Sequence, residues 1–179
     1  MARIITSDQS EELSGARITK RLAALGITLA RWEPPAAGET GALLARKDLS
    51  AEERERVLEG VDDRFEALKR EHGYTRRDLV VIHEDTPGLD EMLRKFDRIH
   101  YHEDDEVRYV LDGRGYFGFV EPDGGQFLLE VSAGDYINVP SRAEHWFEMR
   151  DSRRIKAVRY FIDTAGWVPV YTQRSRRFA

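Results

Sequence analysis

The stretch "DRIHYHEDDEVRYVLDGRG", residues 97–115, decides the fold and raises the question of a metal site. Side chains alternate across a β-strand, so His100 and His102 project from the same face. The dipeptide Asp104–Asp105 predicts a turn, which returns the chain antiparallel and brings Glu106 beside the two histidines. Imidazole and carboxylate groups that meet in this way are ligands that divalent transition metals accept.

A candidate for the fourth ligand follows in "GDYINVPSRAEHWFEM", residues 134–149. His145 stands at the start of a predicted strand, after a glycine turn and a proline. A single strand-borne histidine is more often a hydrogen-bonded or surface residue than a ligand. Three histidines that can converge with Glu106 indicate a metal site instead.

The strand that begins at Glu106 also carries a cation. Glu106, Arg108 and Val110 share a face by alternation, so Arg108 points into the barrel if Glu106 does.

Three histidines and one glutamate suit Fe²⁺, Ni²⁺, Co²⁺, Mn²⁺, Cu²⁺ or Zn²⁺ as the bound ion. An octahedral ion would keep two coordination positions open, whereas a tetrahedral ion would have none left. An open, positive site favours an anionic oxygen chelate such as an enediolate, whose charge Arg108 would stabilise. The alternative for Arg108 is a surface salt bridge.

Short strands separated by turn residues predict a β-sandwich or barrel for the second half of the chain. The expected strands are 98–103, 106–111, 115–121, 126–131, 136–139, 145–149 and 154–162. Helices are expected at 14–25, from Ser50 to a stop at Gly73, and at 89–96, with strands at 3–6, 27–32 and 79–83 and a loop at 33–41. The helix after Ser50 opens on a capping box with Glu53 and buries one apolar stripe.

The pattern predicts one mainly β domain over residues 1–179, with helices packed outside a barrel. Its parts are a helix-rich 1–96, a metal-binding core at 97–162 and a C-terminal tail at 163–179. In the tail, "TQRSRRFA" at 172–179 is a basic cluster that we expect to be a solvated terminus.

Composition restricts the partners and the compartment. A chain of 179 residues with a net charge of −5 gives no electrostatic reason to bind nucleic acid or an anionic membrane. The absence of cysteine excludes disulfides and thiolate ligands and fits a reducing cytoplasm. The N-terminus does not resemble a signal peptide, and no apolar stretch approaches the ~20 residues that span a membrane. Dense mixed charge favours a monomer.

At these positions the chain resembles the cupin superfamily, whose motifs are G-x5-H-x-H-x3,4-E-x6-G and G-x5-P-x-G-x2-H-x3-N. The first motif matches at His100, His102, Glu106 and Gly113, and the second at Gly134, Pro140 and His145. The resemblance implies a double-stranded β-helix, or jelly-roll barrel, with the N-terminal helices packed against it.

The chain departs from these motifs in three places. Arg94 replaces the leading glycine of the first motif, while Arg142 and Met149 replace the middle glycine and the final asparagine of the second. Because the four ligand positions are intact, the departures bear on loop geometry rather than on metal binding.

The resemblance narrows to the acireductone dioxygenase family of the methionine salvage pathway. It is carried by "KFDRIHYHEDDEVRYVLDGRGYF", "GDYINVPSRAEHWFEM", "RRIKAVRYF…GWVPVY" and Trp32. It implies a dioxygenase that uses one Fe²⁺ or Ni²⁺ per chain to cleave 1,2-dihydroxy-3-keto-5-(methylthio)pentene (acireductone) with O₂. The Fe²⁺ form would give 4-methylthio-2-oxobutanoate and formate, and the Ni²⁺ form 3-methylthiopropionate, formate and carbon monoxide.

The family's functional residues carry over to matching positions of this sequence. The metal would be held by His100, His102, Glu106 and His145. Arg108 would help to form the substrate dianion, and Asp105 would relay differences between metals into loop conformation.

The methylthio tail would lie against an apolar wall formed by Phe96, Phe147 and Trp167. Phe147 also shares the strand face of His145 by alternation, whereas Phe96 and Trp167 are equally compatible with the core. Arg159 lies on an apolar strand face and needs a partner, either a carboxylate or the substrate.

Two other classes of protein are compatible with four cupin ligands. Another cupin metalloenzyme, such as a different dioxygenase or a sugar-phosphate isomerase, is the first. A sugar-phosphate site should present several cations, and only Arg108 lies beside the ligands by alternation. A non-catalytic binding barrel is the second, although such modules need not keep every ligand. Unchanged turnover in a His145→Ala variant would exclude a metal enzyme.

Overall fold

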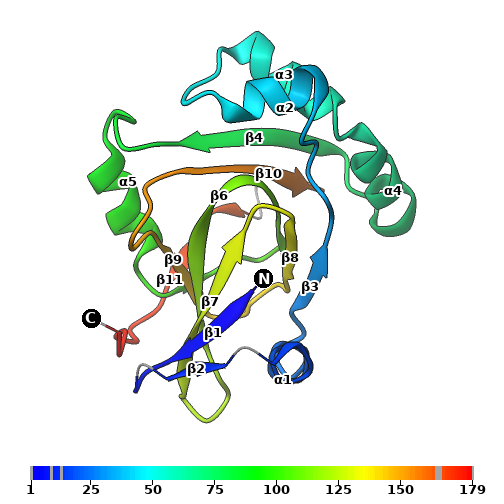
Figure 1. The fold of residues 1–179 in the computed structure, drawn as a ribbon. Helices are drawn as coiled ribbons and strands as arrows, with labels where there is room; N and C mark the ends of the chain where they lie inside the picture. The colour runs from blue at the N-terminus through cyan, green and yellow to red at the C-terminus, as the bar shows by residue number, and fades with distance from the viewer. Residues whose placement is uncertain (1, 9, 13, 164–166, 179) are drawn as a thin grey trace.

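The computed structural model describes residues 2–178 apart from 9, 13 and 164–166, and it is mainly β, as predicted (Figure 1). Residues 164–166 and 179 of the predicted C-terminal tail therefore lie outside the described residues. The helices are α1 (Gly15–Ala23), α2 (Gly38–Ala45), α3 (Ala51–Glu59), α4 (Asp62–His72) and α5 (Leu89–Phe96). The strands are β1 (Arg3–Thr6), β2 (Glu11–Glu12), β3 (Thr28–Arg31), β4 (Arg76–Ile82), β5 (His100–Tyr101), β6 (Glu106–Val120), β7 (Gln126–Ser132), β8 (Asp135–Val139), β9 (His145–Glu148), β10 (Ile155–Phe161) and β11 (Val170–Tyr171).

Two antiparallel sheets share β6 and enclose the interior of the barrel. One sheet runs in the order β11-β5-β9-β6-β7-β1-β2. The other, which we call the helix-covered sheet, runs β4-β10-β6-β8-β3. Figure 1 shows β4 and β10 crossing beneath α2 and α3, with β1 and β7 on the far side of the barrel.

The prediction of two strands at 106–111 and 115–121 was wrong, because β6 is one strand through both segments. Its first half pairs with β8 and β10, and its second half pairs with β7 and β9. Gly113 has a φ of 77°, and a β-carbon there would lie 2.0 Å from the carbonyl oxygen of Arg154. The glycine thus marks the bend at which β6 passes from one sheet to the other, rather than a hairpin turn.

The capping box of Ser50 and Glu53 is confirmed, but the long helix predicted after it is divided into α3 and α4. Gly60 ends α3, and a β-carbon on it would lie 2.1 Å from the hydroxyl oxygen of Thr40. Thr40 belongs to α2, which falls partly in the segment that we predicted as a loop. The close approach of α2 therefore coincides with the break between the two helices.

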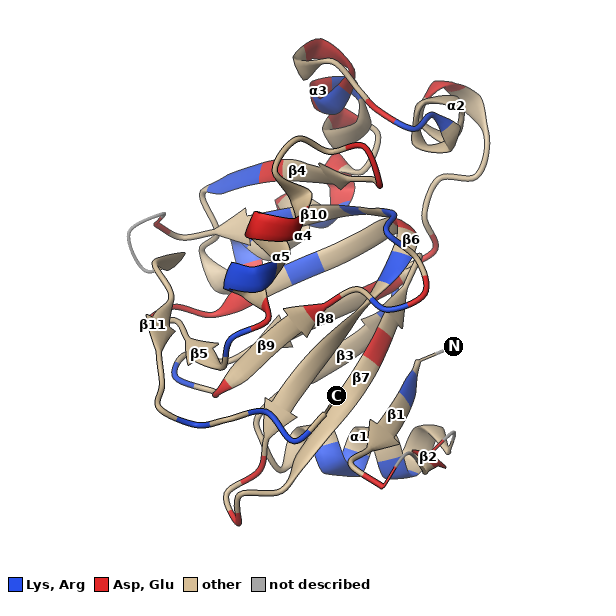
Figure 2. Cartoon of the chain, turned by 90° about the vertical axis from the view of Figure 1, so that its left-hand side faces the viewer, with Lys and Arg blue, Asp and Glu red and all other residues tan. Residues whose placement is uncertain are grey.

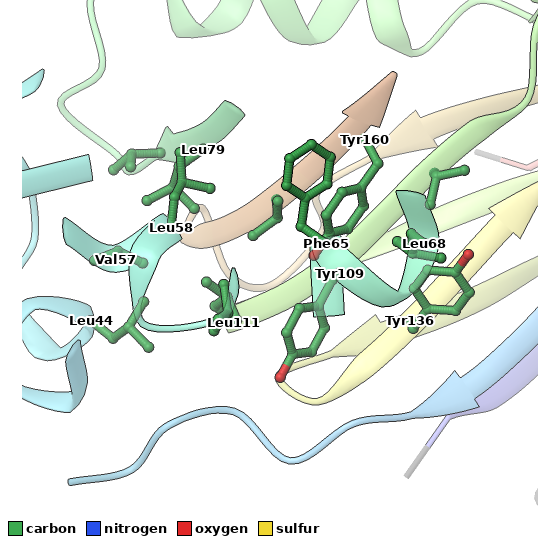
Figure 3. Packing of buried hydrophobic residues seen from close by; sticks show 14 of the residues in the cluster. Leu44, Val57, Leu58, Phe65, Leu68, Leu79, Tyr109, Leu111, Tyr136 and Tyr160 are labelled. Carbon is green, nitrogen blue, oxygen red and sulfur yellow. The ribbon is translucent and has the colours of Figure 1, made fainter. Parts of the chain in front are cut away.

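Helices α2, α3 and α4 cover the outer face of the helix-covered sheet (Figure 3). The predicted apolar stripe of the helical region faces this core, and burying one such side chain contributes roughly 1.5–3 kcal/mol. The labelled members of the cluster are Leu44, Val57, Leu58, Phe65, Leu68, Leu79, Tyr109, Leu111, Tyr136 and Tyr160. Since side chains alternate, the residues between them on β4, β6 and β10 point into the barrel.

The prediction of a solvated C-terminus holds for Gln173, Arg174, Ser175 and Arg177, which are exposed, but it was wrong for the end of the tail. Phe178 is buried and packs near Trp146, with ring centroids 6.0 Å apart. Arg176 forms ion pairs with Asp97 and with Glu148. The basic residues of the tail are therefore partly neutralised by acids of the barrel, and an aromatic side chain anchors its end.

Charges of both signs are interspersed over the helices and strands, as Figure 2 shows. Among the described residues, no helix combines the length and the apolar character needed to cross a membrane.

Candidate metal centre

His100, His102, Glu106 and His145 come together inside the barrel, and all four are buried. Each offers one ligand atom, and these atoms lie within 4.8 Å of one another. His100 pairs directly with His145, because β5 lies between β9 and β11. The predicted hairpin between the strands of His100 and Glu106 is therefore wrong, although the predicted convergence of the side chains is present.

The hydrogen bonds of two histidines fix which nitrogen faces the centre. The Nδ1 atom of His100 lies 2.6 Å from the carbonyl oxygen of Arg98, and that of His145 lies 2.8 Å from the carbonyl oxygen of Ala143. A carbonyl only accepts, so each Nδ1 carries the proton and the neutral ring presents a lone pair at Nε2. This backbone support is the usual way in which metal-binding imidazoles are oriented.

The resulting lone pairs point at a carboxylate. Nε2 of His145 lies 2.9 Å from Oε2 of Glu106, and Nε2 of His102 lies 3.0 Å from the same oxygen. Two acceptors at this distance repel each other unless a cation lies between them. Nδ1 of His102 is buried without a hydrogen-bond partner among the described residues, and its Nε2 is the nitrogen that faces Glu106. The four side chains fit a divalent cation.

Burial keeps the site in the protonation state that binds metal. Desolvation, aided by the neighbouring His145, lowers the pKa of His100 to about 4, so this imidazole is neutral near pH 7. Burial opposes the charge of Glu106, whereas the positive charge of Arg108, the largest of the opposing effects, favours it. The pKa of Glu106 is thus well below its ordinary value, and the carboxylate is ionised.

Arg108 projects into the same cavity, and one guanidinium nitrogen lies 2.9 Å from Oε1 of Glu106. Its ion pair is with a buried metal-ligand candidate, rather than with a surface acid. Burial lowers the pKa of Arg108 to about 10, which leaves it charged at neutral pH. The ring of Trp167 lies 4.3 Å from the guanidinium carbon and covers this cation.

The four residues predicted to bind substrate all line a cavity of about 230 Å³ beside the ligands. Phe96 lies on α5 and is 38% exposed, whereas Phe147 lies on β9. Arg159 has the carboxylate partner that its apolar surroundings required: its Nε donates to Oδ1 of Asp78 at 2.7 Å, and a second nitrogen pairs with Oδ2.

Asp105 lies outside the residues that line this cavity. One of its carboxylate oxygens accepts a hydrogen bond from the backbone N–H of Ser141 at 2.9 Å, and the other accepts one from the amide of Asn138 at 3.3 Å. Asp105 thus holds the loop that leads to His145.

Sequence reasoning missed six apolar residues of β4, β6 and β10 that line the cavity. Alternation with Arg108 or Arg159 identified the face of Val110, Ile155 and Ala157, so a closer use of that signal would have found them. Residues of β4 gave no such signal, because their place beside β10 depends on long-range pairing. The six are Val80, Ile82, Val110, Phe117, Ile155 and Ala157.

An antiparallel barrel with three buried histidines and a glutamate at its centre defines a class, the metal-binding proteins of the cupin type. The model of the ARD/ARD′ family matches residues 36–169, and the chain belongs to this family. Membership makes it a metal-dependent oxidoreductase and argues against the isomerase and the non-catalytic barrel.

Similar proteins agree with this assignment. The chain is 52% identical over 163 residues to the acireductone dioxygenase of Microcystis aeruginosa, covering 91% of this chain and 88% of that one. It is 50% identical over 134 residues to that of Leptospira biflexa serovar Patoc, covering 75% of each. A solved structure of the acireductone dioxygenase from Bacillus anthracis, with a cadmium ion in its active center, superposes with a TM-score of 0.85 at 32% identity over 96% of this chain and 98% of that one. The predicted cupin fold with N-terminal helices is confirmed.

Proposed function

We propose that this protein is an acireductone dioxygenase of methionine salvage, which cleaves 1,2-dihydroxy-3-keto-5-(methylthio)pentene with O₂. The observation that carries the proposal is the buried group of three histidines and Glu106, with the charged Arg108 against it, in a chain of this family. A substrate that becomes a negatively charged enediolate would be attracted by the positive charges of the bound metal ion and of Arg108.

We propose Fe²⁺ or Ni²⁺ as the cofactor, one ion per chain, held by His100, His102, Glu106 and His145. When bound, the ion supplies Lewis-acid chemistry that polarises the enediol oxygens of the substrate. The proposed products with Fe²⁺ are 4-methylthio-2-oxobutanoate and formate. With Ni²⁺ they are 3-methylthiopropionate, formate and carbon monoxide.

The residues around the ligands have separate proposed roles. Arg108 stabilises the negative charge of the deprotonated enediol, which lowers the pKa of the substrate hydroxyl. Trp167 covers Arg108 and excludes water from it, and Phe96 and Phe147 contact the methylthio tail. Arg159 adds an ion-paired cation to the cavity, and Asp105 relays changes at the metal into the loop before His145.

We further propose that the chain acts as one domain and as a monomer in the cytoplasm. Interspersed surface charge and the cysteine-free sequence support this proposal.

The test is O₂ uptake with freshly generated acireductone, comparing metal-free, Fe²⁺-loaded and Ni²⁺-loaded protein, with headspace carbon monoxide recorded in the same run. We expect uptake only with metal, and carbon monoxide only with Ni²⁺. No uptake above the uncatalysed background in either loaded form would overturn the proposal. His145→Ala should abolish uptake, whereas the matched control His72→Ala, at the exposed end of α4, should retain it.

A further inference from the structure

The inner face of the helix-covered sheet carries three rows of side chains across β4, β10 and β6. Strand β10 pairs with β4 throughout, and its pairing with β6 shifts register between Lys156 and Ala157. The first two rows therefore contain one inward-facing residue from each strand, and the third contains one from β4 and one from β10. The first row is Asp78, Arg159 and Arg108. It is fully charged, and it lies beside Glu106, with which Arg108 forms an ion pair.

The next two rows are apolar. The second row is Val80, Ala157 and Val110, and all three side chains line the cavity. The third row contains Ile82 and Ile155, which also line it. Successive rows are about 6–7 Å apart along the strands, so the wall changes from charged to apolar within one step.

The opposite wall of the cavity comes from the other sheet. Phe117 and Phe147 are paired in register, and both line the cavity. The Phe147 ring is held against Gly115, where a β-carbon would lie 2.3 Å from it. That same β-carbon position is 3.5 Å from Cδ1 of Ile155, so Phe147 and the third row lie close together. The ring of Phe147 is thus fixed by close packing, and Ala157, which lines the same cavity, is the small residue between the two valines of the second row.

We infer that the second row sets the size of the substrate tail, and that Ala157 is the specificity-determining residue. The inference rests on the proposed function and extends it to the choice among acireductones. A substrate whose enediolate lies beside Arg108 extends its tail along the apolar rows. Because alanine is smaller than valine, Ala157 leaves room for that tail, while Val80 and Val110 limit the width of the cavity on either side.

The experiment compares kcat/KM for acireductones with methyl, methylthioethyl and longer alkyl tails in the metal-loaded enzyme. Ala157→Val narrows the cavity, and we expect kcat/KM for the methylthioethyl substrate to fall about tenfold or more relative to the methyl substrate. Val80→Ala widens it, and we expect the preference to move toward the longer tail. Val81→Ala is the matched control, because Val81 is the next residue of β4 and belongs to the core beneath the helices. It should lower stability and leave the ratio of kcat/KM values unchanged.

A second measurement separates this inference from the proposed function. Dissociation constants of straight-chain alkyl hydroxamates, which join a chelating head to an apolar tail, are measured by calorimetry with Ni²⁺-loaded protein. The preferred tail should become shorter in Ala157→Val and longer in Val80→Ala. An unchanged dependence on tail length in both variants would overturn the inference, even if every acireductone is consumed. Absence of turnover with a shifted hydroxamate preference would instead overturn the proposed function and support the inference.

Discussion

Arg142 replaces the middle glycine of the second cupin motif, and it keeps the backbone conformation of a glycine, with a φ of 65°. Its N–H donates to the carbonyl oxygen of His102 at 2.9 Å, and its side chain pairs with Glu103 at 2.8 Å. The loop therefore keeps the geometry that glycine would give it, and the backbone strain is confined to Arg142, which lies between two segments that carry metal-ligand candidates. Left-handed backbone costs a non-glycine residue roughly 1–2 kcal/mol.

This strain predicts an order of stability for substitutions at Arg142. Arg142→Gly should raise the free energy of unfolding by up to about 1 kcal/mol, since relief of strain exceeds the loss of an exposed ion pair. Arg142→Val should lower it, because a β-branched side chain is poorly compatible with positive φ. Urea unfolding of the three proteins would check the order. Equal stability of the glycine and valine variants would contradict it.

A variant of Arg108 would separate the proposed stabilisation of substrate charge from metal binding. In Arg108→Gln, Glu106 still faces three histidines, so we expect one bound ion per chain by metal analysis. Loss of a preorganised cation should reduce kcat/KM by about 10²–10³-fold. Arg153→Gln is the matched control, because the ion pair of Arg153 with Asp90 is exposed. A parallel loss of metal and activity in Arg108→Gln would show that Arg108 acts through the ligands.

At the scale of the element, the bend of β6 should tolerate no side chain. Gly113→Ala combines positive φ with a contact of 2.0 Å to a backbone oxygen, so we expect a loss of more than about 2 kcal/mol in the free energy of unfolding. Gly124→Ala provides the control, since Gly124 also has positive φ but its β-carbon would meet nothing closer than 4.0 Å. It should cost only about 1 kcal/mol. Similar losses in the two variants, measured by chemical unfolding, would rule out the clash.

Local patterns predicted the elements whose ends depend on their own residues. The bounds of α5 and the first turn of α3 were found because an apolar stripe and a capping box are local signals. The break between α3 and α4 was not, since it coincides with the contact of Gly60 with Thr40. The continuity of β6 through Gly113 also depends on pairing with distant strands.

The residues of the candidate site also fall into two groups: those that local patterns predict and those whose positions depend on distant strands. Alternation placed His100 and His102 on one face, and placed Arg108 with Glu106, because that rule needs only neighbouring residues. It did not place Val80 in the cavity, since the register of β4 against β10 joins segments far apart in the sequence. Recognition of the family supplied the roles of the ligands, which spacing alone left open among several metals.

At the scale of the molecule, the metal centre joins parts of the barrel that have few other links. β5 is a two-residue strand, and its pairing with β9 is the single pair of His100 with His145. On its other side it pairs with β11, and the anchored Phe178 follows in the same C-terminal segment. A cation held by residues of these segments would therefore tie β5, whose direct pairing with β9 is sparse, to β6 and β9.

This cross-link predicts that metal raises the melting temperature of the protein. A ligand that binds only the folded state at 1,000 times its Kd contributes about 4 kcal/mol, and for a chain of this size each kcal/mol raises Tm by roughly 2–4 °C. Calorimetry of the metal-free protein with added Ni²⁺ should thus show an increase on the order of 10 °C. His145→Ala should lose most of this increase, because it removes the ligand of β9, and His72→Ala should keep all of it. An equal increase in His145→Ala would mean that Ni²⁺ stabilises the fold from another site, and that these four residues do not form its main binding site.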